Sequence, residues 1–166
     1  MGSEMCIRDR LESGHKSFAF ASGVAAQTAV LDLLNPGDHV IAFDDLYGGT
    51  FRLFNEIKRK SSNIEFTFID LNTNFSKEIK KNTKMIWIET PTNPLLKITD
   101  LKRIARIARK NRLITVCDNT FATPYNQRPL EHGIDIVNHS TTKYINGHSD
   151  VIGGALVIGK NKKLEK

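Results

Sequence analysis

Short apolar, β-branched runs alternate along this chain with segments that have the spacing of amphipathic helices. The runs lie near Phe18, near Val40, and at residues 64–69, 85–88, 113–117, 134–137 and 155–158. The helical patterns between them include residues 25–34, 49–60, 75–81 and 99–110. Strands that alternate with helices form a largely parallel sheet, because each helix is the crossover that a parallel strand needs. The pattern predicts an α/β domain with helices on both faces of its sheet.

Polar or aromatic residues follow several of these runs. Tyr47 lies beyond the run near Val40, Glu89 follows residues 85–88, Asp118 follows residues 113–117 and Ser140 follows residues 134–137. In an open α/β sheet, ligands bind at the carboxyl ends of the strands. We therefore expect these side chains around one site.

A lysine set among hydroxyl side chains occurs in the segment Ser-Thr-Thr-Lys-Tyr at residues 140–144. An amine forms an imine with an aldehyde, and the hydroxyls one and three residues before Lys143 can hydrogen-bond a phosphate. That pairing is what pyridoxal phosphate requires. Taken by itself, the segment also fits a solvated surface lysine, as most lysines are.

Asp118 opens the segment Asp-Asn-Thr-Phe, and a carboxylate at this strand end could pair with a protonated pyridine nitrogen. A turn-capping aspartate is the alternative interpretation. The small residues Ala-Ser-Gly-Val at 21–24 precede a helical pattern, and a helix N-terminus favours a phosphate.

Two further segments contain rigid or glycine-rich turns. Residues 47–50, Tyr-Gly-Gly-Thr, place an aromatic ring beside glycines that let the backbone approach a ligand, or else only pack a turn. Residues 89–94, Glu-Thr-Pro-Thr-Asn-Pro, contain two prolines that stiffen the turn. Its polar groups are otherwise typical of a loop.

In this order, and together with Gly-His-Ser-Asp at 147–150, these segments resemble the cystathionine γ-lyase and γ-synthase group of the Cys/Met-metabolism family of pyridoxal-phosphate enzymes. The resemblance covers about residues 18–158. It implies the type I fold of pyridoxal-phosphate-dependent transferases, with a mostly parallel seven-stranded sheet that contains one antiparallel strand.

The resemblance also implies roles for individual residues. Lys143 would be the Schiff-base lysine and proton shuttle, and Asp118 would pair with the pyridine nitrogen. The phosphate cradle would consist of Ser140, Thr142 and the backbone of Gly23 and Val24. The family often has Met or Leu at the position of Val24, which affects little because the contact is through the backbone.

The remaining roles concern the ring and the substrate. Tyr47 would stack on the cofactor and, in its ionised form, take part in proton transfer from the incoming amino group. Thr120 would lie near the ring and Asn93 would face the cofactor hydroxyl. Arg52 resembles a substrate-binding position, and Glu89 would support the site without touching the cofactor.

The implied activity is that of a cystathionine γ-lyase, which releases cysteine, 2-oxobutanoate and ammonia. The motifs are shared with cystathionine γ-synthase, which uses cysteine to replace the γ substituent of an O-acyl-homoserine. O-acylhomoserine sulfhydrylase and methionine γ-lyase are further alternatives. The resemblance also implies a homotetramer built from dimers that share active sites, acting on a small sulfur amino acid.

The chain has 166 residues, whereas subunits of the family are about twice as long. We expect residues 11–166 to be a partial large domain, without the N-terminal arm and the C-terminal domain of the family. Residues 1–10 resemble nothing in the family and could be an artefact, a tag or a genuine variable terminus. An inactive cofactor-binding fragment is the alternative that is not an enzyme.

Composition and charge argue against several other classes of protein. The net charge of +6 is concentrated on one face of the helical pattern at 99–110 and in the terminal residues 160–166, and no nucleic-acid-binding motif occurs. No apolar run is long enough for a membrane helix. The two cysteines, Cys6 and Cys117, give no disulfide framework, and Cys117 is expected in a buried strand. No metal site is expected, and the cytoplasm is the expected location.

Overall fold

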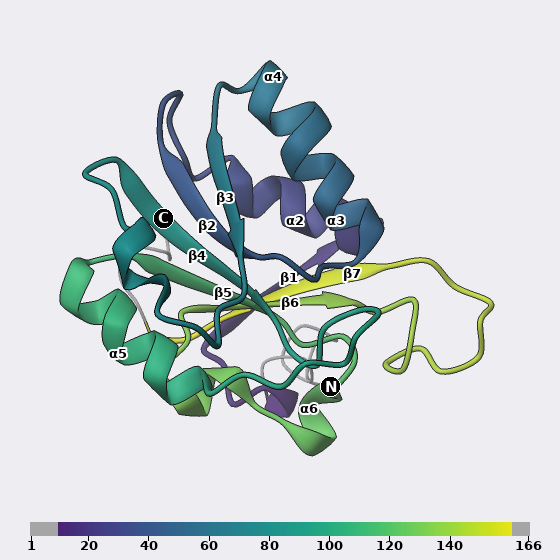
Figure 1. The fold of residues 1–166 in the computed structure, drawn as a ribbon. Coiled ribbons are helices and arrows are strands. Elements are labelled where there is room, and N and C mark those ends of the chain that lie inside the picture. The colour runs from purple at the N-terminus through teal and green to yellow at the C-terminus, as the bar shows by residue number, and fades with distance from the viewer. Residues whose placement is uncertain (1–9, 161–166) are drawn as a thin grey trace.

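The computed structural model describes residues 10–160. Residues 1–9 and 161–166 lie outside the described part, and with them Cys6, most of the unassigned segment 1–10 and most of the basic C-terminal cluster. The described residues form one sheet in the order β1-β7-β6-β5-β4-β2-β3 (Figure 1). The strands are Lys16–Phe20 (β1), His39–Phe43 (β2), Glu65–Ile69 (β3), Thr83–Glu89 (β4), Ile114–Asp118 (β5), Ile136–Ser140 (β6) and Gly154–Ile158 (β7).

Strand β7 pairs antiparallel with both of its neighbours, β1 and β6. All other pairs in the sheet are parallel. The prediction of a seven-stranded sheet with one antiparallel strand is therefore confirmed. Because the parallel strands end at the same edge, the residues that follow β4, β5 and β6 are brought together.

Helices cover both faces of the sheet, as predicted: α2, α3 and α4 lie on one side, and α5 and α6 lie on the other (Figure 1). The α-helices are Gly23–Leu31 (α2), Gly48–Arg52 (α3), Arg59–Ser61 (α4), Leu101–Asn111 (α5) and Thr123–Asn126 (α6). A π-helical segment, Leu53–Lys58 (η1), joins α3 to α4, and two 3₁₀ turns span Phe75–Glu78 (η2) and Pro129–His132 (η3).

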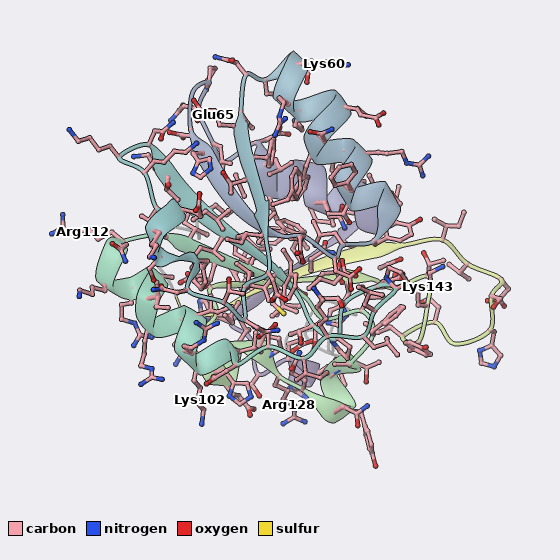
Figure 2. The ribbon with its side chains drawn as sticks, viewed as in Figure 1. Lys60, Glu65, Lys102, Arg112, Arg128 and Lys143 are labelled. Atoms are coloured by element: carbon pink, nitrogen blue, oxygen red, sulfur yellow. The ribbon has the colours of Figure 1, made fainter. Side chains whose placement is uncertain are left out.

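Helix α5 shows how its sequence specifies its position. Its apolar stripe, which includes Leu101, Ile104 and Ala108, is buried. The Asp100 carboxylate caps the first turn by accepting a hydrogen bond from the Arg103 amide at 2.9 Å. Lys102 points away from the sheet (Figure 2), so the basic face of this helix is a solvated surface, as the charge pattern indicated.

Two predicted elements differ from the structure. The helix expected at residues 75–81 is only the 3₁₀ turn η2, in which Phe75 is the one buried residue. A segment with a single buried anchor lacks the repeated apolar face that stabilises a longer helix by tertiary packing. The strand expected at residues 134–137 is displaced to Ile136–Ser140. Its last three residues are polar, with Asn138 and His139 buried and Ser140 half-buried, and were not recognised as strand.

Much of the core lies on strands β2, β4 and β5, whose residues are almost all buried. Trp87 of β4 packs edge-on against Phe54, with ring centroids 5.1 Å apart. Cys117 is fully buried in β5, as predicted, and burial raises the pKa of its thiol. Within residues 10–160, no helix is long and apolar enough to span a bilayer, and no three metal-ligating side chains cluster.

Candidate functional site

A cavity of about 460 Å³ opens at the carboxyl edge of the sheet. Its walls come from the ends of β4, β5 and β6, the first turn of α2, and the loops that follow these strands. All the site residues expected from the sequence line this cavity except Arg52. Arg52 is exposed on α3, where its Nε donates to the carbonyl of Gly48 at 3.3 Å.

Asp118 ends β5 and is 7% exposed. Its Oδ1 accepts a hydrogen bond from the Thr120 amide at 3.0 Å, and its Oδ2 accepts from Asn138 Nδ2 at 2.8 Å and from Gln27 Nε2 at 3.3 Å. These three donors fix the orientation of the carboxylate without carrying a positive charge. The negative charge of Asp118 is therefore available to a cationic group of a ligand.

Gln27 and Asn138 were not identified from the sequence. Gln27 lies one helical turn after Gly23 on α2, and its Nε2 also donates to Thr50 Oγ1 at 2.9 Å. Asn138 lies two residues before Ser140 in β6. The i, i+4 spacing of a helix and the i, i+2 spacing of a strand place each of them on the same side as a residue that was identified. These spacings are the signal that could have revealed them.

The first turn of α2 faces the end of β6. A Cβ added to Gly23 would lie 2.8 Å from Ser140 Cβ and 2.9 Å from Ser140 Cα, so only glycine permits this approach. The first amides of a helix have no acceptor within the helix, and the helix dipole adds a partial positive charge there. The amides of Gly23 and Val24 therefore favour an anion in this corner of the cavity.

The two hydroxyl residues before Lys143 differ in their contacts. The backbone amide of Ser140 donates to Thr120 Oγ1 at 2.9 Å, which ties β6 to the loop after β5. Thr142 Oγ1 donates to the carbonyl of Gly153 at 3.2 Å and accepts from the Gly153 amide at 3.1 Å. Thr142 thus joins the two ends of the loop between β6 and β7 as well as lining the cavity.

Lys143 is exposed in this loop, beyond the carboxyl end of β6 (Figure 2). Its backbone is held in a turn, because its amide donates to the Ser140 carbonyl at 3.3 Å and its carbonyl accepts from the Gly147 amide at 2.8 Å. No described residue forms an ion pair with its amine. The amine is therefore free to react with a ligand in the cavity.

Tyr47 and Glu89 form the opposite wall. The Tyr47 ring lies against Gly49, where an added Cβ would be 2.5 Å from Tyr47 Cε1. The Tyr47 amide donates to both carboxylate oxygens of Glu89, at 3.3 and 3.0 Å. Burial, then the charges of Asp118 and Asp45, raise the pKa of Glu89 to about 8. Glu89 therefore lines the cavity and holds the backbone that carries the Tyr47 ring.

Asn93 lies in the loop after β4, which is fixed by its own hydrogen bonds. Thr92 Oγ1 donates to the Asp45 carboxylate, and the Leu95 amide donates to Asp45 Oδ2 at 3.0 Å. The Lys97 amide donates to Thr92 Oγ1 at 2.8 Å. These hydrogen bonds fix the backbone of the loop that places Asn93 at the cavity.

Known proteins resemble this chain in sequence and in structure. A family model described as "Cys/Met metabolism PLP-dependent enzyme" matches residues 5–166, so the match includes residues 5–10 of the segment left unassigned above. The chain is 54% identical over 163 residues to a cystathionine β-lyase of Coxiella burnetii, which covers 97% of this chain and 42% of that protein. It is also 54% identical over 156 residues to a cystathionine γ-lyase of Bacillus subtilis, covering 93% of this chain and 41% of that protein.

A solved structure with a similar fold is that of cystathionine γ-lyase from Lactobacillus plantarum complexed with L-serine. It superposes with a TM-score of 0.94 at 46% identity, over 97% of this chain and 42% of that one. The chain thus spans less than half the length of each of these relatives.

Proposed function

Because this chain belongs to the Cys/Met-metabolism family of PLP-dependent enzymes, we propose that its cavity binds pyridoxal phosphate and that the complete protein is a cystathionine γ-lyase. The observation that supports this most strongly is the pairing of Asp118 and Lys143 in one cavity of about 460 Å³. One supplies a buried carboxylate without a cationic partner among the described residues, and the other supplies an amine.

The residues present fit this cofactor in three respects. The first turn of α2 supplies backbone donors for a phosphate, and Gly23 lets this turn approach Ser140 closely. The carboxylate of Asp118 lies where a pyridinium N–H could donate to it. The Tyr47 ring is 47% exposed at the cavity wall, where an aromatic face is available for stacking.

When bound, pyridoxal phosphate supplies an aldehyde that links to amines and a ring that withdraws electrons from the α carbon of an amino acid. Lys143 would hold the cofactor through its amine, and the same amine would carry protons between neighbouring carbon positions of the substrate. Asp118 keeps the ring nitrogen protonated through its negative charge. The backbone of Gly23 and Val24, with Ser140 and Thr142, would hold the phosphate.

Four residues complete the proposed set. Tyr47 would cover the ring, exclude water from one face and, in its ionised form, accept a proton from the substrate amine at its phenolate oxygen. Asn93 and Thr120 position the ring from the loops after β4 and β5. Arg52 is proposed as a substrate contact in the complete protein, and its exposed position on α3 leaves its guanidinium accessible to a ligand.

A second candidate is a cystathionine β-lyase, because the relative from Coxiella burnetii carries that name at 54% identity. The two reactions differ in which carbon–sulfur bond breaks. γ-Elimination converts cystathionine and water into cysteine, 2-oxobutanoate and ammonia, whereas β-elimination gives homocysteine, pyruvate and ammonia. The cavity residues described above serve both reactions, and they serve the γ-replacement of a γ-synthase as well.

Product analysis tests the proposal. The complete gene product, loaded with pyridoxal phosphate, is given cystathionine alone, or an O-acyl-homoserine with cysteine. We expect 2-oxobutanoate from cystathionine, at a kcat/KM above that of cystathionine formation from the acylated substrate. Pyruvate would assign the protein as a β-lyase, and a ratio that favours replacement would assign it as a γ-synthase. Cofactor binding without turnover of either substrate would make it a binding module.

The organisation of the complete protein is part of the proposal. Residues 11–166 would form the cofactor-binding large domain, and the protein would assemble in the cytoplasm as a homotetramer of dimers that share active sites. Light scattering coupled to size-exclusion chromatography of the complete gene product measures its oligomeric state directly. A monomeric active enzyme would contradict shared sites.

A further inference from the structure

A buried carboxylate outside the cavity connects two of the strands that build it. Glu12 is 1% exposed; its Oε1 is hydrogen-bonded to His139 Nε2 at 2.5 Å and accepts a hydrogen bond from Asn119 Nδ2 at 2.8 Å. Glu12 thereby joins the end of β6 to the residue directly after β5.

The partners of Glu12 alternate with residues that form the site. His139 lies between Asn138 and Ser140 in β6, and successive side chains of a strand point to opposite faces of the sheet. Asn119 lies between Asp118 and Thr120, which both line the cavity. Glu12 therefore holds the backbone of the site from the face of the sheet away from the cavity.

The same network reaches the third strand of the site. Asn119 Nδ2 donates to the Gln127 carbonyl at 2.8 Å, and Gln127 Nε2 donates to Asn119 Oδ1 at 2.9 Å. Gln127 Nε2 also donates to the carbonyl of Thr90 at 3.0 Å, and Thr90 is the residue after Glu89. One connected set of side chains thus fixes the carboxyl ends of β4, β5 and β6.

This network is not one that stability alone would favour. The second oxygen of Glu12, Oε2, is buried and has no hydrogen-bond partner among the described residues. A buried carboxylate is costly unless its partners compensate it fully, and apolar packing could fill the same space. A set of directional bonds, by contrast, specifies where each strand end lies.

We propose that Glu12 is a positioning residue for the cofactor site, acting through Asn119 on Asp118 and Thr120, and through His139 on Asn138 and Ser140. The inference rests on the proposed function, because it concerns the residues proposed to hold the pyridine nitrogen and the phosphate. Its consequence is that Glu12 affects how tightly and in what orientation pyridoxal phosphate is held.

The test uses the complete gene product with Glu12→Ala and the near-isosteric Glu12→Gln. The control is Thr115→Val, near the amino end of the same strand as Asp118. It removes the hydrogen bond that Thr115 Oγ1 donates to Asp135 Oδ2 at 2.8 Å and the one that it accepts from the Asp135 amide at 2.9 Å. Three properties are measured: the Tm of the apoprotein, the Kd for pyridoxal phosphate, and the visible circular dichroism of the bound cofactor.

We expect Glu12→Ala to raise the Kd by about tenfold or more, the range seen when residues that orient a binding group are removed. We also expect the visible circular dichroism to change, because Asp118 and Ser140 shift relative to each other. Thr115→Val should lower the Tm while leaving the Kd and the circular dichroism as in the wild type. Glu12→Gln should change the Kd and circular dichroism in the same direction as Glu12→Ala, by a smaller amount.

A folded Glu12→Ala protein with lower Tm but wild-type Kd and circular dichroism would overturn the inference. If Glu12→Ala does not fold, Glu12→Gln decides, and wild-type cofactor properties in that variant would overturn it equally. A wild-type protein that binds no pyridoxal phosphate would instead overturn the proposed function, and this inference with it. The two failures are therefore distinguishable.

Discussion

Glu89 and Asp118 are register partners at the carboxyl ends of the adjacent parallel strands β4 and β5. Both carboxyl groups are buried, at 6% and 7% exposure, and both line the same cavity. Two neighbouring carboxylates in a buried site do not both ionise readily, and here it is the pKa of Glu89 that is raised, to about 8. Near neutral pH, one proton is therefore held on Glu89 while Asp118 keeps its three hydrogen-bond donors.

The first prediction concerns the pH dependence that this proton causes. The pKa of Glu89 lies above the ordinary value of 4.5. The favourable contribution of this group to the free energy of unfolding of the apoprotein is therefore complete below about pH 4.5 and is lost as the pH rises towards 8. The free energy of unfolding of the wild-type protein should fall by up to about 1.4 kcal/mol per pH unit in that window through Glu89 alone. Glu89→Gln should lack this fall. Urea unfolding of both apoproteins across the window measures this, and equal slopes would contradict it.

A second prediction concerns the opposite end of the sheet, where His39 is fully buried. Its Nδ1 lies 2.8 Å from Thr83 Oγ1 and its Nε2 lies 2.9 Å from Thr67 Oγ1. Burial, and then the charge of Lys80, lower the pKa of His39 to about 4, although Glu65 opposes this. Neutral His39 therefore stabilises the folded protein, and this stabilisation is complete above pH 6.5 and is lost as the pH falls towards 4.

Replacing His39 with Asn should therefore make the protein less stable at neutral pH and should flatten its pH dependence between about pH 6.5 and 4. The wild-type protein should lose up to roughly 3 kcal/mol over this interval through His39 alone, at about 1.4 kcal/mol per pKa unit. Chemical denaturation at closely spaced pH values is the measurement. A variant whose stability falls as steeply as that of the wild type between pH 6.5 and 4 would show that His39 does not cause this fall.

Two adjacent glycines give a matched pair for the third prediction. An alanine at position 49 would push against the Tyr47 ring, whereas position 48 has nothing within 4 Å of an added Cβ. Both residues lie in α3, so the helical preference of alanine acts equally on both. Gly49→Ala should lower kcat/KM by between about tenfold and a hundredfold, as displaced groups in active sites do. Gly48→Ala should leave kcat/KM close to the wild-type value.

The fourth prediction tests the role of Asp118. Asp118→Asn keeps the size of the side chain but removes the charge that would hold a ring nitrogen protonated. We expect turnover of cystathionine to fall by orders of magnitude while the protein remains folded, with a lower Tm because the Asn amide nitrogen cannot accept the hydrogen bonds that one carboxylate oxygen receives. Turnover near the wild-type level would show that the carboxylate has only a structural role, which its contacts with Gln27 and Asn138 would then explain.

Much of the fold was predictable because buried parallel strands appear in the sequence as continuous apolar runs. Strands β2, β4 and β5 were recognised in this way, and the residues that follow them line the cavity. Strand β6 was misplaced by the same reasoning, since Asn138, His139 and Ser140 are polar and yet lie in the sheet. Their hydrogen-bond partners come from distant segments, so local sequence could not show that these groups are satisfied.

The candidate site was predicted unevenly for a related reason. Short motifs identified Lys143, Tyr47 and Asp118, because each follows a recognisable strand or glycine turn. Glu12 was missed entirely, since its partners Asn119 and His139 lie 107 and 127 residues further along the chain. Contacts over such separations depend on the order of strands in the sheet, which the local pattern does not contain.

The central claim is that Lys143 holds pyridoxal phosphate in this cavity, and reduction with borohydride tests it most directly. The cofactor-loaded complete gene product is reduced, digested and mapped by peptide mass spectrometry, with a Lys143→Ala variant as the control. The account predicts a single pyridoxyl group on Lys143 in the wild-type protein and none at that position in the variant. A pyridoxyl group on another lysine of the wild-type protein, with Lys143 unmodified, would contradict it.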